Sequence, residues 1–112
     1  MEKITVSELA AILDRKRKVL FIDVRTKMEY DMMNIGGNRI APTEIESLLP
    51  KLERWKTEPV VVACSRPDSK RTPSVCTVLE KAGFQNVKTL QGGIYAWTVP
   101  FGKGRKVPTI AL

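Results

Sequence analysis

Short apolar runs alternate with amphipathic stretches along this chain. The runs are rich in valine and isoleucine, and they predict strands at 3–6, 19–22, 60–63 and 87–90, with a short edge strand at 39–42. The stretches between them repeat apolar residues at helical spacing, and they predict helices after Ser7, at 27–33, after Thr43, after Thr72 and at 94–97. Strands that alternate with helices predict an α/β fold with a mainly parallel central sheet flanked by helices.

Local signals indicate where these helices begin and end. The hydroxyl residues Ser7, Thr43 and Thr72 are the expected N-caps. Pro50 lies inside the third helical stretch, so we expect a kink there or two short pieces. Gly83 follows the fourth stretch and predicts the C-terminus of that helix.

The regular pattern stops after residue 97. Residues 98–112 contain two prolines, two glycines and three cationic side chains, and we expect them to run extended over the surface. A chain of 112 residues suits one domain with one core. The sequence therefore predicts a single domain over 1–112, with a core at about 3–97 and an extended basic tail at 98–112.

The charge balance favours an anionic substrate or partner. Lys and Arg number 19 against 12 Asp and Glu, which gives a net charge of +7. The run 15–18 supplies part of this excess, and a solvated helix end explains it. Seven aromatic residues without a stacking motif argue against nucleic acid. No apolar run approaches the roughly 20 residues that span a bilayer, and no signal peptide is recognisable, so we expect a cytoplasmic location.

The absence of certain residue types limits the catalytic mechanisms and metal sites that this chain can have. The chain has no histidine, which excludes Cys-His and Ser-His-Asp catalysis and the common histidine-containing zinc sites. Its two cysteines, Cys64 and Cys76, stand twelve positions apart and form no Cys-x-x-Cys motif. A disulfide framework and a thioredoxin-type redox pair are therefore not expected. Any nucleophile must be activated by cations and backbone dipoles.

Cys64 is the candidate nucleophile. It ends the buried strand 60–63, precedes a cationic loop and faces a predicted helix N-terminus, a setting that stabilises a thiolate. In parallel sheets the functional crevice lies at the carboxyl ends of the strands. An inert cysteine packed as a small apolar residue is the alternative. The side chains expected to bind an anion beside it are Ser65, Arg66, Asp68, Ser69, Lys70, Arg71 and Thr72.

Other polar residues are expected to support the site rather than to react. Asp23 and Arg25 follow the strand 19–22 and suit a structural ion pair. Arg25 could also pair with Glu29, which lies four residues later. Cys76 stands among apolar helix positions, which favours core packing over a role as a resolving thiol.

Four motifs in the same order resemble the signatures of rhodanese-like domains. Residues 19–25 with Glu29-Tyr30 resemble Asp-x-Arg…Glu-Tyr, and residues 34–38 stand where the family has His-Ile-Pro-Gly-Ala. Residues 60–64 with the following loop are similar to the active-site segment, and residues 90–97 look like Leu-x-Gly-Gly…Trp. The resemblance covers about residues 3–97.

The resemblance implies a rhodanese-like fold and a sulfurtransferase that needs no metal and no organic cofactor. Cys64 would accept a sulfane sulfur from a small anionic donor such as thiosulfate. The resulting persulfide would pass this sulfur to a thiol or a cyanide-like acceptor, or to a protein partner in a sulfur relay. The sulfurtransferases of the family carry Cys-x-x-Gly-x-Arg. Here Pro67 occupies the glycine position, and Arg71 lies seven positions beyond Cys64.

Two alternative functions remain open at this point. The longer basic loop also suits a related cysteine-dependent phosphatase or arsenate reductase. An altered loop also suits a non-catalytic rhodanese-like module that binds an anionic partner or serves in regulation.

Overall fold

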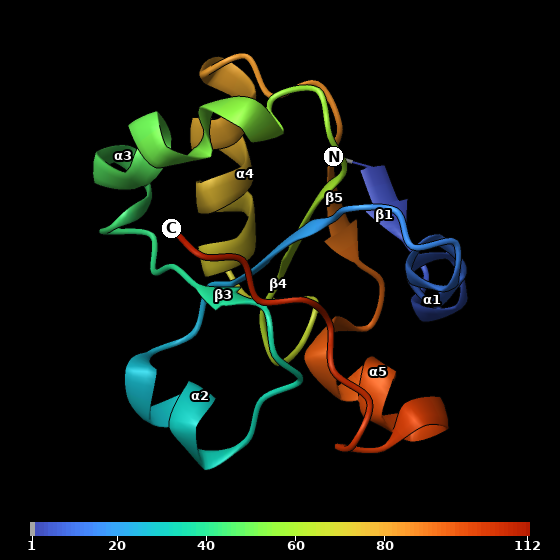
Figure 1. Ribbon diagram of the computed structural model, residues 1–112. Helices are drawn as coiled ribbons and strands as arrows, with labels where there is room; N and C mark the ends of the chain where they lie inside the picture. The colour runs from blue at the N-terminus through green and yellow to red at the C-terminus, as the bar shows by residue number, and fades with distance from the viewer. Residues whose placement is uncertain (1) are drawn as a thin grey trace.

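Five strands form one parallel sheet in the computed structural model, which describes residues 2–112 (Figure 1). They are β1 (Glu2–Ile4), β2 (Leu20–Asp23), β3 (Asn38–Arg39), β4 (Val60–Ala63) and β5 (Val87–Leu90). Their order across the sheet is β1-β5-β4-β2-β3, and each neighbouring pair is parallel. The predicted α/β fold is confirmed.

The strands differ from their predicted bounds mainly at the edges of the sheet. Every residue of β2 and β4 is buried, as expected for central strands that are covered on both faces. The predictions at 60–63 and 87–90 are confirmed, whereas β2 begins one residue later than predicted. β1 ends at Ile4 because Thr5 caps the next helix. β3 covers Asn38–Arg39 rather than the predicted 39–42. It does not extend to Ala41, since the N–H of Ala41 donates to a Glu44 carboxylate oxygen (3.0 Å) rather than to the sheet.

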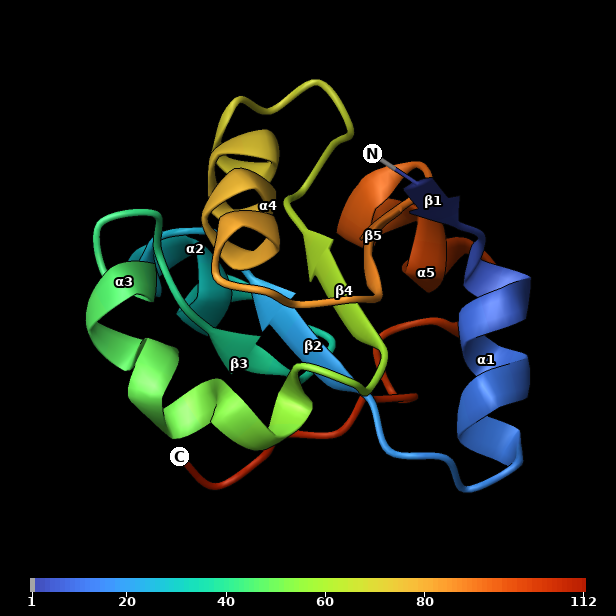
Figure 2. The same cartoon turned by 90° about the horizontal axis from the view of Figure 1, so that it is seen from above.

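Helices cover the two faces of the sheet (Figure 2). One face carries α1 (Val6–Asp14) and α5 (Gly93–Phe101); the other carries α3 (Ile45–Leu48), the 3₁₀ helix η1 (Leu49–Trp55) and α4 (Arg71–Lys81). Each face buries its own apolar cluster. The first includes Leu9 and Trp97, and the second includes Val62 and Leu79. The sheet is therefore the middle of three layers.

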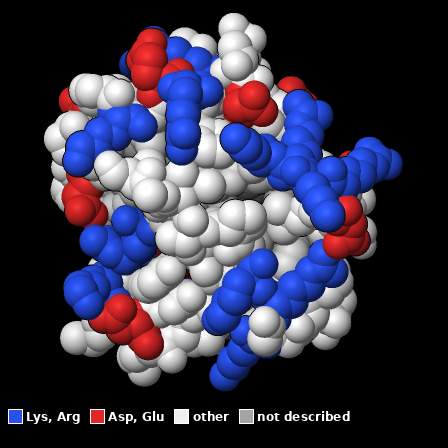
Figure 3. Space-filling model, in the orientation of Figure 1, with Lys and Arg blue, Asp and Glu red and all other residues white. Residues whose placement is uncertain are grey.

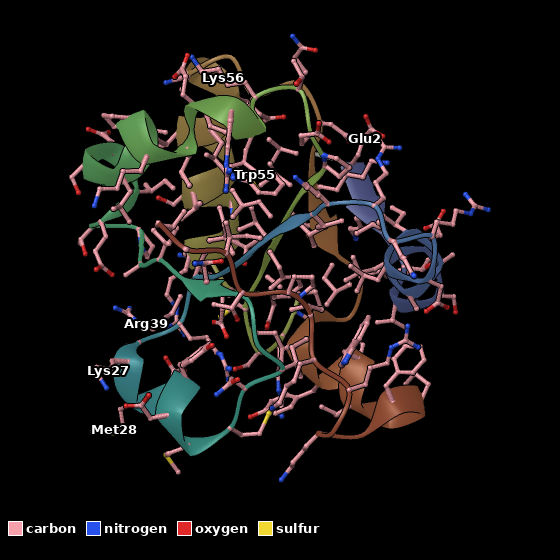
Figure 4. All side chains as sticks on the ribbon, viewed as in Figure 1. Glu2, Lys27, Met28, Arg39, Trp55 and Lys56 are labelled. Carbon is pink, nitrogen blue, oxygen red and sulfur yellow. The ribbon has the colours of Figure 1, made fainter. Side chains whose placement is uncertain are left out.

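The helix α2 (Lys27–Met32) belongs to neither buried layer. It contains no buried residue, and its Lys27 and Met28 side chains point away from the body of the domain (Figure 4). A capping box holds its first turn, because Thr26 and Glu29 each bond to the backbone N–H of the other.

The predicted N-cap of the first helix is wrong. α1 begins at Val6, and its N-cap is Thr5 rather than Ser7. The Thr5 hydroxyl accepts a hydrogen bond from the Glu8 N–H (3.0 Å), and the Glu8 carboxylate accepts one from the Thr5 N–H (2.9 Å). Two reciprocal bonds satisfy more backbone donors than a lone serine can, so the Thr-x-x-Glu spacing decides where the helix begins.

Two further predicted N-caps are also wrong. α3 begins at Ile45, two residues after Thr43, and no side chain caps it. α4 begins at Arg71, so Thr72 lies inside its first turn, where it is buried. The hydroxyl at this helix start comes from Ser69, which accepts a hydrogen bond from the Arg71 N–H (3.1 Å).

Two helix breaks occur where proline and glycine predict them. α3 ends at Leu48, and η1 carries Pro50 in its first turn, so this stretch forms two short pieces. Gly83 follows α4 with a φ of +96°. This left-handed conformation suits glycine after a helix C-terminus.

The prediction of an extended chain from Thr98 is wrong for residues 98–101. α5 continues to Phe101, and Pro100 lies in its last turns. The helical spacing brings Phe101 onto Trp97, with ring centroids 4.6 Å apart, and this contact favours the continued helix.

The residues after α5 run back across the molecule towards β3 (Figure 1). Val107 is buried, and its N–H donates to the Ile35 carbonyl (2.7 Å). The Asn38 side chain exchanges two hydrogen bonds with the backbone of Ile110 (2.7 and 2.9 Å). The tail thus adds buried contacts to the core instead of only covering the surface, and we propose that residues 1–112 fold as one unit.

Positive charge gathers over α1 and along the tail on the face that Figure 3 presents. The four residues of the run 15–18 are all exposed, as expected for a solvated helix end. Across residues 2–112, no helix has the length and apolar character needed to cross a membrane.

We predict that Val107→Ala lowers the free energy of unfolding by about 2 kcal/mol, because it removes buried methyl groups and leaves a cavity. Val99→Ala is the matched control. Val99 is 86% exposed, so its substitution should stay within about 0.5 kcal/mol of wild type. Urea unfolding of both variants measures the difference, and equal losses would contradict a buried role for the tail.

Candidate active site at Cys64

Cys64 lies at the carboxyl end of β4, the middle strand of the sheet. Its side chain is 3% exposed and packs in the same cluster as Val60 and Val62, on the face that α4 covers. Residues 65–70 form an irregular loop between this strand and α4. The cysteine thus occupies the position at which parallel sheets carry functional residues.

A hollow of about 330 Å³ opens beside the cysteine. Figure 2 shows the loop standing between α4 on one side and β5 and β1 on the other. The lining residues from Cys64 to the start of α4 are Cys64, Arg66, Pro67, Asp68, Ser69, Lys70, Thr72 and Pro73. The structure therefore brings five of the seven predicted anion-binding residues around one hollow with Cys64, whereas Ser65 and Arg71 do not line it.

The N-terminus of α5 holds the start of the loop. The N–H of Ile94 donates to the Cys64 carbonyl (2.8 Å), and the N–H of Tyr95 donates to the Ser65 carbonyl (3.4 Å). Gly93 permits this approach: a Cβ added there would lie 2.5 Å from the Ser65 carbonyl oxygen. Because a trans peptide directs its N–H opposite to its carbonyl, the N–H groups of Ser65 and Arg66 point away from α5.

The loop offers several backbone donors. Within residues 2–112, no protein acceptor is bonded to the N–H groups of Ser65, Arg66, Asp68, Ser69 and Lys70. Pro67, in the middle of the loop, has no N–H to offer. Successive backbone N–H groups in a tight loop form a concavity that can bind an anion.

Arg71 ties the far end of the loop to α2. Its guanidinium donates to both carboxylate oxygens of Glu29, at 2.8 and 3.4 Å. This bond, with the bonds to Thr26, lowers the pKa of Glu29 to about 2. The same contact raises the pKa of Arg71, and the charges of Cys64 and Asp23 raise it further. The guanidinium therefore braces the loop against α2.

Of the two partners considered for Arg25, Asp23 forms the ion pair and Glu29 does not. Arg25 pairs with Asp23 at 3.0 Å through Nε and 2.9 Å through Nη2, and both side chains are buried. Burial lowers the pKa of Arg25, but the hydrogen bonds and charge of Asp23 outweigh it, so the pKa is raised. Arg25 also donates to the Met33 carbonyl (2.8 Å), which joins the end of β2 to the end of α2.

The second cysteine is part of the core. Cys76 lies on α4 with no exposed surface, and burial raises the pKa of its thiol to about 11. The interpretation of Cys76 as a packing residue is confirmed. Within residues 2–112, no three His, Cys, Asp or Glu side chains come together as a set of metal ligands.

Sequence reasoning missed one wall of the hollow. Lys3, Thr89 and Gln91 line it from the β1 and β5 side. These residues lie near Cys64 because β5 is placed between β1 and β4 in the sheet. A cationic residue inside the predicted strand 3–6 was the available signal, but it did not indicate which strand lay beside it.

We predict that Gly93→Ala destabilises the protein much more than Gly102→Ala. Both glycines have positive φ (+75° and +65°), which costs alanine roughly 1–3 kcal/mol. Only the Cβ at Gly93 would also meet backbone, whereas nothing lies within 4 Å of a Cβ at Gly102. Thermal unfolding of the two variants distinguishes the effect of the backbone contact from the effect of positive φ. Equal losses of stability in the two variants would contradict the close approach of α5 to the loop.

We predict that Glu29→Gln lowers stability at pH 7 by up to about 1 kcal/mol, since the ion pair is partly exposed and glutamine can keep the capping box. A folded pKa of about 2, below the 4.5 usual for glutamate, means that the charge stabilises the protein above pH 4.5. The difference from wild type should therefore shrink below that pH and vanish near pH 2. Urea unfolding across this range is the measurement, and a pH-independent difference would exclude the carboxylate charge as the cause.

Comparison with known proteins identifies relatives of this chain. The family model for the rhodanese-like domain matches residues 5–99. A curated relative from Mycobacterium tuberculosis, the probable adenylyltransferase/sulfurtransferase MoeZ, is 36% identical over 97 residues that cover 84% of this chain. The chain spans only 24% of that relative's length.

Solved structures give the same result for the fold. The thiosulfate sulfurtransferase of Pseudomonas aeruginosa superimposes with a TM-score of 0.72 at 25% identity, covering 99% of this chain and 22% of that one. A rhodanese-like domain protein of Staphylococcus aureus gives 0.66 at 28% identity, covering 87% of this chain and 91% of the other. The family model, the relative and these folds agree: this chain belongs to the rhodanese-like domain family.

Proposed function

We propose that this domain transfers sulfane sulfur through a persulfide on Cys64. The observation that carries the proposal is the loop after Cys64, which is held by α5, has backbone N–H groups without protein acceptors, and lines a basic hollow together with the cysteine. The names of two relatives support the same chemistry, since one is a probable sulfurtransferase and the other a thiosulfate sulfurtransferase.

The reaction has two steps, each a displacement at sulfur. The Cys64 thiolate attacks the sulfane sulfur of a donor such as thiosulfate; the donor's S–S bond breaks and sulfite leaves with the electron pair. Cys64 then carries a persulfide. An acceptor thiolate or cyanide attacks the outer sulfur, which leaves with the acceptor as a persulfide or as thiocyanate, and the Cys64 thiolate is restored. No net oxidation or reduction of the protein occurs.

The surrounding residues have separate parts in this proposal. The loop N–H groups and the side chains of Arg66 and Lys70 offset the negative charge of the donor and of the persulfide. Arg71 and Glu29 hold the loop in place through their ion pair. Ser69 and Thr72 line the hollow and can donate hydroxyl groups to an anion.

The setting of the reaction is also proposed. Cys64 and Cys76 are both free thiols, which suits the reducing cytoplasm. A thiol on another protein would be a suitable acceptor in a sulfur relay, since the persulfide needs only a thiophilic partner that reaches Cys64.

We predict that a sulfane donor adds sulfur to Cys64 and that cyanide removes it. The purified protein is incubated with thiosulfate or an organic persulfide, and its intact mass is taken before and after cyanide. Cys64→Ser should gain no adduct, whereas Cys76→Ala should behave as wild type because Cys76 is buried.

The same preparations distinguish the alternatives. Release of phosphate from an aryl phosphate, or reduction of arsenate, that disappears in Cys64→Ser would favour the phosphatase or arsenate reductase. Absence of a sulfur adduct with every donor, together with no activity towards aryl phosphate or arsenate, would contradict the proposal and favour a binding module.

A further inference from the structure

We propose that the hollow beside Cys64 binds an extended organic persulfide that carries carboxylates, and that Lys3 is the cation at its far end. This inference rests on the proposed function, because it names the class of sulfur donor for the same cysteine.

The floor of the hollow is one row of residues across the sheet. The strand register pairs Lys3 with Thr89, and Thr89 with Val62, so the three side chains lie on the same face. Cys64 follows Val62 by two positions and shares that face. Val62 has no exposed surface, Thr89 is partly exposed and Lys3 is exposed. The row therefore leads from the buried cysteine to solvent at the edge of the sheet.

The dimensions of the hollow suit an organic molecule. Two strand spacings separate β4 from β1, which amounts to about 10 Å. The volume of about 330 Å³ lies at the small end of the roughly 300–1,000 Å³ that is usual for pockets that bind organic ligands. Apolar lining with accessible surface comes from Pro67 and Pro73. An inorganic ion bound at the sulfur would leave most of this space without a contact.

The charges around the hollow suit carboxylates that lie away from the sulfur. Lys3, Arg66 and Lys70 line it from two different elements, and Asp68 is the one acidic residue in the lining. Among residues 2–112, none of these three cations forms an ion pair. Positive charge is thus spread along the hollow from the loop to the edge strand.

Two features weaken a compact site for a small oxyanion. Pro67 removes one backbone donor from the loop. Arg71 is bonded to both oxygens of Glu29 and does not line the hollow. An extended donor gains affinity from contacts that an inorganic anion cannot make.

The sulfur transfer balances without a further reactant. The Cys64 thiolate attacks the outer sulfur of R–S–SH, the S–S bond of the donor breaks, and R–S⁻ leaves with the electron pair. The products are the Cys64 persulfide and the donor's thiolate. The hollow holds R while the bond breaks.

The test uses two peptide persulfides of equal size. One is the persulfide of N-acetyl-cysteinyl-glycyl-aspartate, which has two carboxylates, and the other is its diamide, which has none. Persulfide formation on Cys64 is followed by mass spectrometry, and kcat/KM is measured for each donor. We expect wild type to prefer the dianion at low ionic strength by about fivefold, and this preference should decline as salt screens the charges.

Variants identify the cation that is responsible. Lys3→Gln should reduce the preference for the dianion by about two- to fivefold. Lys3→Glu should reduce it further, because it places a negative charge at the same position. Lys81→Gln, on α4 outside the lining, should keep the wild-type preference.

The outcomes separate this inference from the proposed function. Equal kcat/KM for the two donors in wild type, or an unchanged preference in both Lys3 variants, would overturn the inference while leaving sulfur transfer intact. Failure of both donors to modify Cys64 would instead overturn the proposed function.

Discussion

The site depends on the contact between the N-terminus of α5 and the Cys64 loop. Two N–H groups of the helix satisfy the Cys64 and Ser65 carbonyls, which would otherwise lie beside the core without partners. Gly93 allows the helix to approach closely enough for these bonds, since any side chain would occupy the space of the Ser65 carbonyl. By fixing the two carbonyls on one side, the contact turns the N–H groups of Ser65 and Arg66 to the other, where an anion can meet them.

Two ion pairs hold the segments around this contact. The buried Asp23–Arg25 pair fixes the end of β2, and the Val24 N–H at that end donates to the Ala63 carbonyl next to Cys64 (3.0 Å). The Glu29–Arg71 pair joins α2 to the start of α4, so both ends of the loop are held. A chain without histidine can in this way set a cysteine among backbone donors and cations, without a general base beside it.

Much of the fold could be predicted from local patterns, because β4 is a continuous apolar run and Pro50 and Gly83 act on their own neighbours. The first residue of each helix was harder to predict, since several hydroxyl residues near it compete to cap the helix. In the site, Cys64 and most of its loop were predicted from their position after a strand. Two features were not: the Glu29–Arg71 pair spans 42 positions, and Lys3 reaches the hollow only because β5 separates β1 from β4.

The central claim is that the loop amides hold the anion formed on Cys64. Backbone ¹H–¹⁵N NMR spectra of the reduced and the persulfidated protein test it most directly. We expect the largest shift changes at Ser65, Arg66 and residues 68–70, whereas the N–H groups of Ile94 and Tyr95, which are already bonded to the loop carbonyls, change little. Changes centred on α5, or spread evenly over the sheet with none in the loop, would contradict the account.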